Sequence, residues 1–134
     1  MEILSLKFES ADLFETLAQL ESGLPMDSFD YFREKLGLSE SALSDAIGIA
    51  LRTLTRRKQS GFLTSRESER LVRLGRLFDK AVEVFGDDET IAASWFKEPA
   101  VSLGSQTPLK MAETEIGAQE VNALLVRIEH GVFT

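Results

Sequence analysis

Apolar residues recur every three or four positions over most of this chain, and that spacing is typical of amphipathic helices. The repeat runs through residues 12–21, 28–36, 64–85, 88–96 and 118–129. Glycine or proline interrupts it between most of these segments, as expected where helices end. Residues 1–8 alternate only weakly and fit either a short strand or a loose arm. The pattern therefore predicts an all-α protein.

Side chains that can cap a helix mark the predicted helix starts in the first two thirds of the chain. Thr64 and Glu67 form a T-x-x-E capping box ahead of the longest helix. Asp27 or Ser28 is expected to cap the helix that ends at Gly37. These signals place a short helical bundle before residue 86.

The last third is predicted to hold three further helices. Asp88 can cap the first, and residues 98–106 form a loop. Thr107 followed by Pro108 predicts the start of a short helix over residues 109–114, which we expect to end near Gly117. The final helix then spans residues 118–129 and ends at Gly131.

Residues 39–60 have the pattern of a helix-turn-helix. Ser39 is a good N-cap for a first short helix, and Gly48 can supply the positive φ that a tight turn needs. Leu43 is expected on the inner face of the first helix, with Ile49 and Leu54 joining the two helices.

The second helix of this unit carries basic and hydroxyl side chains on its remaining faces. An α-helix fits the major groove of DNA, where arginine can bond a guanine edge through two hydrogen bonds. We expect Arg52 and Arg56 to read bases, with Thr55, Arg57 and Lys58 nearer the phosphates. The alternative is a basic, solvated helix in an unrelated bundle. The candidate DNA-binding residues are Arg52, Thr53, Thr55, Arg56, Arg57 and Lys58.

The charge is distributed unevenly along the chain. The whole chain of 134 residues has a net charge of −7. Residues 37–76 hold eight basic and four acidic residues, so this window is +4 and the remainder is −11. Arg70, Arg73 and Arg76 add a basic stripe to the long helix, either as a solvated face or as phosphate or toxin contacts. The asymmetry favours a nucleic-acid-facing part joined to a part with another partner, although clustering on solvated helix faces would look the same.

The chain offers little catalytic chemistry. Cysteine is absent, which excludes disulfides and thiolate chemistry and fits a cytoplasmic protein. His130 is the single histidine and is best interpreted as a helix cap, while Trp95 is interpreted as a core anchor. No metal-ligand spacing, glycine-rich phosphate loop, transmembrane run or signal peptide is found. We therefore expect no enzyme activity, no metal, no cofactor and no membrane partner.

Most of the chain resembles a known family. Its residues 47–74, IGIALRTLTRRKQSGFLTSRESERLVRL, resemble the helix-turn-helix of Xre-type antitoxins and the helix after it. The following part of the chain resembles the C-terminal toxin-binding domain of Xre/MbcA/ParS-type antitoxins. The residues that carry this resemblance are Ala92, Trp95, Pro99, Leu103, Gly104, Thr107, Pro108, Thr114, Gly117, Val121, Leu124 and Gly131. The resemblance covers residues 29–134. Phe96 departs from a common Leu, and Ser105 departs from a common second Gly.

The resemblance implies a definite function and domain organisation. It implies an antitoxin that binds a RES-domain toxin, which depletes NAD, and blocks its active site. It also implies a homodimer that binds operator DNA and represses its own operon. The expected parts are an N-terminal arm and first helix (1–26), an Xre-like helix-turn-helix domain with its long following helix (27–86), and a toxin-binding domain (87–134).

The end of the chain is the expected site of toxin neutralisation. Apolar residues at a free end gain little unless a partner covers them. The alternative is that Phe133 folds back onto its own module. The candidate toxin-binding residues are Arg127, Glu129, His130, Gly131, Val132, Phe133 and Thr134.

Two functions of other kinds remain open from the sequence. One is a stand-alone helix-turn-helix transcriptional regulator whose C-terminal module dimerises or senses a ligand. The other is an adaptor whose helix-turn-helix has lost DNA binding. A neighbouring gene for a RES-type protein would favour the antitoxin.

Overall fold

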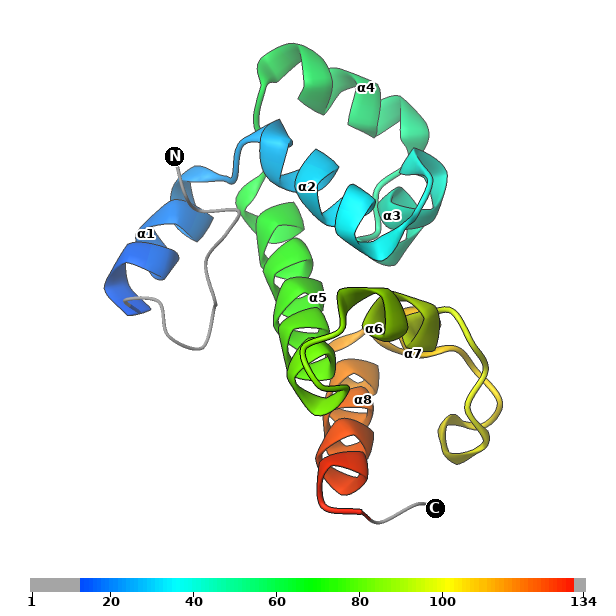
Figure 1. Cartoon of the computed structure of the whole chain (residues 1–134). Helices are drawn as coiled ribbons and strands as arrows, with labels where there is room; N and C mark the ends of the chain where they lie inside the picture. Colours follow the sequence, from blue (N-terminus) through cyan, green and yellow to red (C-terminus); the bar gives the residue numbers. More distant parts are fainter. Residues whose placement is uncertain (1–12, 132–134) are drawn as a thin grey trace.

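The computed structural model describes residues 13–131, which form eight α-helices and one 3-10 helix (Figure 1). No strand occurs in this range, so the predicted all-α fold is confirmed; the weak alternation of residues 1–8 lies outside the described residues. The α-helices are α1 (Leu13–Ser22), α2 (Met26–Leu36), α3 (Glu40–Ala46), α4 (Leu51–Ser60), α5 (Ser65–Val84), α6 (Glu89–Phe96), α7 (Pro108–Met111) and α8 (Glu115–Glu129), with the 3-10 helix η3 at Val101–Leu103.

The longest helix, α5, runs through the middle of the molecule, and both halves of the chain pack on it (Figure 1). It begins with the predicted capping box. The hydroxyl of Thr64 accepts the N–H of Glu67 at 3.2 Å, and the Glu67 carboxylate accepts the N–H of Thr64 at 2.9 Å. The two reciprocal bonds satisfy donors that a helix start leaves free.

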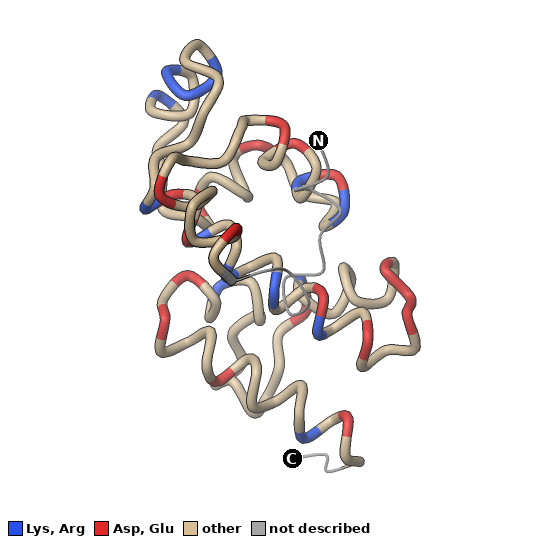
Figure 2. Tube along the Cα trace, turned by 90° about the vertical axis from the view of Figure 1, so that its left-hand side faces the viewer, with Lys and Arg blue, Asp and Glu red and all other residues tan. Residues whose placement is uncertain are grey.

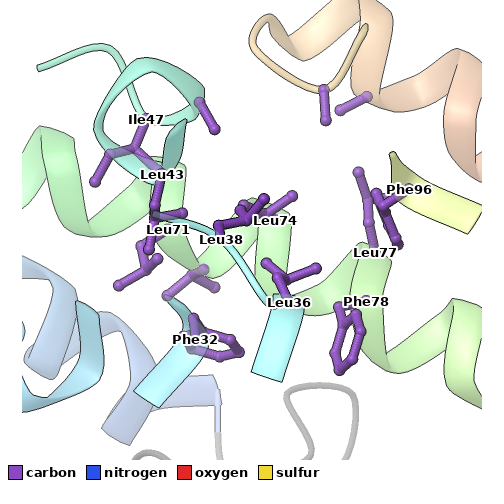
Figure 3. Close-up of a cluster of buried hydrophobic side chains, with 14 of the residues drawn as sticks. Phe32, Leu36, Leu38, Leu43, Ile47, Leu71, Leu74, Leu77, Phe78 and Phe96 are labelled. Carbon is purple, nitrogen blue, oxygen red and sulfur yellow. The ribbon is translucent and has the colours of Figure 1, made fainter. Parts of the chain in front are cut away.

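The first half of α5 shares its core with the preceding helices. Phe32 and Leu36 of α2 point toward Leu71 and Leu74 of α5, and Leu43 of α3 closes the cluster (Figure 3). These side chains are at most 4 % exposed. The apolar stripe predicted for each helix is thus the face that is buried here.

The second half of α5 shares its core with the C-terminal helices. The rings of Phe78 on α5 and Phe96 on α6 lie 6.2 Å apart. Trp95 is half-buried, and its ring lies 5.7 Å from that of Phe85 and 5.3 Å from that of Phe96. This aromatic packing agrees with the interpretation of Trp95 as an anchor rather than a stacking platform.

The predicted cap of α2 is wrong. The helix begins at Met26 after Pro25, which makes no side-chain capping bond, while Asp27 is exposed and Ser28 is fully buried within the helix. The helix start is held instead by distant backbone, because the N–H of Met26 donates to the carbonyl of Gly61 at 2.9 Å. Such a tertiary bond removes the need for a local cap.

The predicted boundary between the last two helices is also wrong. Gly117 does not end the short helix but lies in the first turn of α8, which Thr114 caps by accepting the N–H of Gly117 at 3.0 Å. A Cβ atom at residue 117 would lie 1.8 Å from the carbonyl oxygen of Met111. The glycine is therefore present because the end of α7 approaches the helix backbone closely.

Between residues 13 and 131, no helix is both long enough and apolar enough to span a membrane.

Candidate nucleic-acid interface and partner module

The turn between α3 and α4 has the predicted geometry. The hydroxyl of Ser39 accepts the N–H of Ala42 at 3.1 Å and so caps α3. Gly48 has a φ of +75°, and the next N–H, of Ile49, donates to the carbonyl of Ser44 at 2.9 Å. Positive φ costs a side-chain-bearing residue free energy, which explains the glycine.

The second helix, α4, presents a basic surface at one end of the molecule. Its only buried residue is Leu54, which packs toward α3. Arg52, Arg56 and Lys58 are exposed, and α4 contains no acidic residue. Lys and Arg gather at this end of the molecule in Figure 2, away from the C-terminus. A helix of this shape and charge can lie in the major groove.

Among the candidate DNA-binding residues, some already have partners within the chain. Lys58 pairs with Glu40 across the turn at 2.5 Å, but both side chains are nearly half exposed, so solvent screens the pair. The Thr55 hydroxyl donates to the carbonyl of Leu51 at 3.2 Å, and Thr53 is half-buried. No such partner is seen for Arg52 or Arg56 among the described residues.

Arg57 differs from the other arginines of α4. Its Nε and Nη2 atoms donate to the two carboxylate oxygens of Glu67, at 2.8 and 3.0 Å. Burial alone would raise the pKa of the Glu67 carboxyl, but the bonds from Arg57 and from the backbone of Thr64 outweigh it and lower that pKa. The same bond raises the pKa of Arg57. Glu67 is therefore ionised at neutral pH and holds Arg57 in place.

Sequence reasoning did not identify two residues at this interface. Leu51, the first residue of α4, is 52 % exposed and could touch a thymine methyl group. The sequence feature that could have identified Leu51 is an apolar side chain that is not among the residues predicted to join the two helices. The second is Glu67, whose capping box was recognised without its bond to Arg57. The spacing of residues within the capping box gives no indication that Glu67 also bonds to a side chain of the preceding helix.

The arginine stripe of α5 is mostly occupied within the molecule. Arg70 donates to the carbonyl of Ile47 at the end of α3, at 3.4 Å. Arg73 donates to the carbonyl of Glu113 beyond α7, at 3.0 Å. Cationic side chains suit helix C-termini because the carbonyls there carry partial negative charge. Arg76 remains exposed.

The described part of the candidate toxin-binding end is partly anchored. Glu129 forms a 2.8 Å ion pair with Lys80 of α5, and this hydrogen bond lowers the pKa of Glu129 and raises that of Lys80. Arg127 is half-buried, whereas His130 is the exposed C-cap of α8 and Gly131 follows with a φ of +77°. Val132, Phe133 and Thr134 lie outside the described residues.

The loop between α6 and α7 is closed by its own backbone. The N–H of Ala100 donates to the carbonyl of Gln106 at 3.0 Å, and Gly104 and Ser105 both have a φ of +66°. Ser105 thus adopts a conformation that favours glycine, which is why a second glycine is expected there. No group of three or more potential metal ligands forms among residues 13–131.

Known proteins match both parts of this architecture. Residues 15–76 match the antitoxin Xre-like helix-turn-helix domain, and residues 80–131 match the antitoxin Xre/MbcA/ParS C-terminal toxin-binding domain. The two matches meet within α5.

Curated relatives agree over most of the chain. A protein named antitoxin Xre from Yersinia enterocolitica is 39% identical over 116 residues, which are 86% of this chain and 78% of the relative. An antitoxin Xre from Photorhabdus laumondii is 38% identical over the same length and shares. One from Pseudomonas putida is 34% identical over 84 residues, 62% of this chain and 52% of the relative. With an Xre-like helix-turn-helix, a toxin-binding module and these relatives, the chain belongs to the Xre family of antitoxins.

Proposed function

We propose that this antitoxin inhibits a RES-domain, NAD-depleting toxin by occluding its active site and represses its own operon by binding operator DNA. The observation that carries the proposal is the arrangement of two surfaces on one chain. A basic helix, α4, lies at one end, and the module matched as toxin-binding lies toward the other (Figures 1 and 2). One molecule can then serve two partners.

The DNA-binding half of the proposal rests on the free cations of α4. Arg52 and Arg56 are exposed and have no described intramolecular partner, so they are available to guanine edges. Lys58 and the Thr55 hydroxyl are proposed to contact phosphates, because exchanging a screened surface pair for a phosphate costs little.

A gel-shift series on the promoter DNA tests this half. Arg52→Ala and Arg56→Ala should each weaken operator binding by about 1–3 kcal/mol and relax specificity at one base pair. Lys110→Ala removes an exposed cation of α7, outside the helix-turn-helix, and is the matched control, with operator affinity unchanged. Unchanged operator affinity in both α4 variants would refute base reading by these residues.

The toxin-binding half of the proposal concerns the end of the chain. Glu129 is tied to Lys80, so α8 is anchored up to its last turn, and Gly131 then allows the chain to change direction. We propose that residues 131–134 extend from this anchored helix into the NAD pocket of the toxin. Arg127, Glu129 and His130 would flank that contact.

A truncation lacking residues 131–134 separates tail contact from binding by the rest of the module. The truncated chain should stay folded and bind DNA, because the buried stripe of α8 is retained. Its protection of NAD against the toxin should fall. Ile116→Ala, a 76 % exposed site on the same helix, serves as control. Full protection by the truncated chain would exclude the tail as the inhibitory segment, and failure of the full chain to bind a RES-domain protein would exclude that toxin class.

Homodimerisation is part of the proposal because one helix-turn-helix reads only a few base pairs. Two copies on half-sites about one DNA turn apart would supply the missing specificity. Light scattering of the operator complex should show at least two copies. A single copy on a short, non-palindromic site would contradict this part.

A further inference from the structure

The ion pair between Arg57 and Glu67 links the recognition helix, α4, to α5, the next helix along the chain. Two parallel hydrogen bonds of 2.8 and 3.0 Å join the guanidinium to the carboxylate. The Glu67 side chain is 7% exposed and that of Arg57 is 23% exposed. Paired bonds of this kind fix orientation as well as distance, because both groups are planar.

The same carboxylate also holds the start of α5. Oxygen Oε1 of Glu67 accepts both the Nε of Arg57 and the backbone N–H of Thr64, at 2.8 and 2.9 Å. The last turn of α4 is thereby tied to the first turn of the central helix, across the link at Gly61. Leu54 is the one buried residue of α4, so this largely buried pair adds a firm polar attachment to a helix with a small apolar contact.

Arg57 would lose this bond if it turned toward a DNA phosphate. Glu67 would then keep a buried charge without its cationic partner, which is strongly unfavourable. Arg56, the next residue along α4, carries the same charge on the exposed side without that constraint. Adjacent arginines of one helix thus have different environments.

We propose that Arg57 is a positioning residue: through Glu67 it fixes the end of the recognition helix to the start of α5, and it does not bind phosphate. This inference rests on the proposed DNA binding. Losing the pair lowers the fraction of molecules whose α4 is correctly placed. If that fraction falls to about a tenth, operator affinity falls about tenfold, since apparent affinity scales with the competent fraction.

The salt dependence of operator binding distinguishes positioning from phosphate contact. Each lost phosphate contact reduces the slope of log K against log salt by about 0.9. Arg57→Ala should therefore weaken binding about tenfold and leave the slope unchanged. Arg56→Ala is the comparison variant, because it removes the same positive charge from the neighbouring position of α4. A slope reduced by about 0.9 in Arg57→Ala, or an unchanged affinity, overturns the proposal.

The Glu67→Gln variant should change operator affinity in opposite directions for the two possible roles of Arg57, positioning and phosphate binding. Glutamine can still accept the N–H of Thr64, so the capping box survives while the charge is lost. A positioning Arg57 predicts weaker operator binding in this variant. A phosphate-binding Arg57 predicts tighter binding with a steeper slope, because the arginine is released. In the double variant, the two losses should not add, since both substitutions remove one interaction.

Hydrogen exchange of the free protein tests the link without DNA. The α4 amides should exchange faster in Arg57→Ala and Glu67→Gln than in Arg56→Ala, with circular dichroism confirming that all three are folded. Equal exchange in the three variants overturns the link. If the wild-type chain binds no promoter DNA, the proposed function fails and the DNA role of Arg57 fails with it, whereas the exchange result still decides whether the pair holds α4.

Discussion

At residue 117, the absence of a side chain lets two helices approach. Alanine normally stabilises a helix relative to glycine by about 0.5–1 kcal/mol. Here a Cβ atom would lie 1.8 Å from the carbonyl oxygen of Met111, so backbone has to move. We expect Gly117→Ala to lower the free energy of unfolding by about 1–3 kcal/mol, measured by urea denaturation.

A second site on α8 controls for helix propensity. Asn122 is exposed on the same helix, and Asn122→Ala should change the free energy of unfolding by about 0.5 kcal/mol or less. A Gly117→Ala variant as stable as the wild type would show that the end of α7 yields without cost.

At the scale of one element, the start of α5 should make stability depend on pH through Glu67. Its pKa is lowered in the folded chain, so the ionised carboxylate adds stability that is present above the unfolded-state pKa of about 4.3. That stability is lost as pH falls through the folded pKa. Glu67→Gln should cost about 1–2 kcal/mol at pH 7. The difference from wild type should shrink in urea titrations below about pH 4.

An exposed acid two residues further along α5 gives the comparison. Glu69→Gln should change the free energy of unfolding by about 0.5 kcal/mol or less at pH 7. A difference between wild type and Glu67→Gln that stays constant from pH 7 to pH 3 would argue against a stabilising charged form of Glu67.

At the scale of the whole molecule, the two halves should unfold together. One buried apolar cluster runs from α2 to α8 through α5, and Lys35 of α2 pairs with Glu89 of α6 at 2.8 Å. Domains with a shared core tend to unfold in one step. Trp95 fluorescence, which reports the C-terminal half, should therefore give the same urea midpoint as circular dichroism.

A core variant extends this test. Phe96→Ala removes a fully buried ring that packs against Phe78 and should lower the free energy of unfolding by about 3–5 kcal/mol. The far-UV transition of the whole chain should move with it. Separate midpoints for the two probes, or a far-UV transition that splits in the variant, would show that the halves unfold independently.

Local chemistry explains why much of the fold could be predicted. Ser39, Thr64 and Thr107 cap the helices that follow them, and each bond spans three residues of chain. Helical phase placed Arg52 and Arg56 on the outer face of α4 and Leu54 on the inner one. Interactions of this range are visible in the order of residues because the helix itself sets the geometry.

The wrong and missing predictions involve groups from different elements. The start of α2 is held by a hydrogen bond to the carbonyl of Gly61. Residue 117 is a glycine because the end of α7 leaves no room for a side chain there. Neither neighbour can be found from spacing along one helix. Local rules therefore predict a helix cap correctly where a residue nearby in the sequence supplies it. They fail where backbone that is distant in the sequence takes the place of the cap.

The order of residues by itself determined most of the helices, the turn at Gly48 and the family, because each depends on short-range patterns or on motif similarity. Only the tertiary structure decided which basic side chains are free. Arg52 and Arg56 face solvent, whereas Arg57 is bonded to Glu67. The physical reason is that this salt bridge requires the last turn of α4 to meet the first turn of α5, and the placement of the two helices follows from the packing of the shared core around α5.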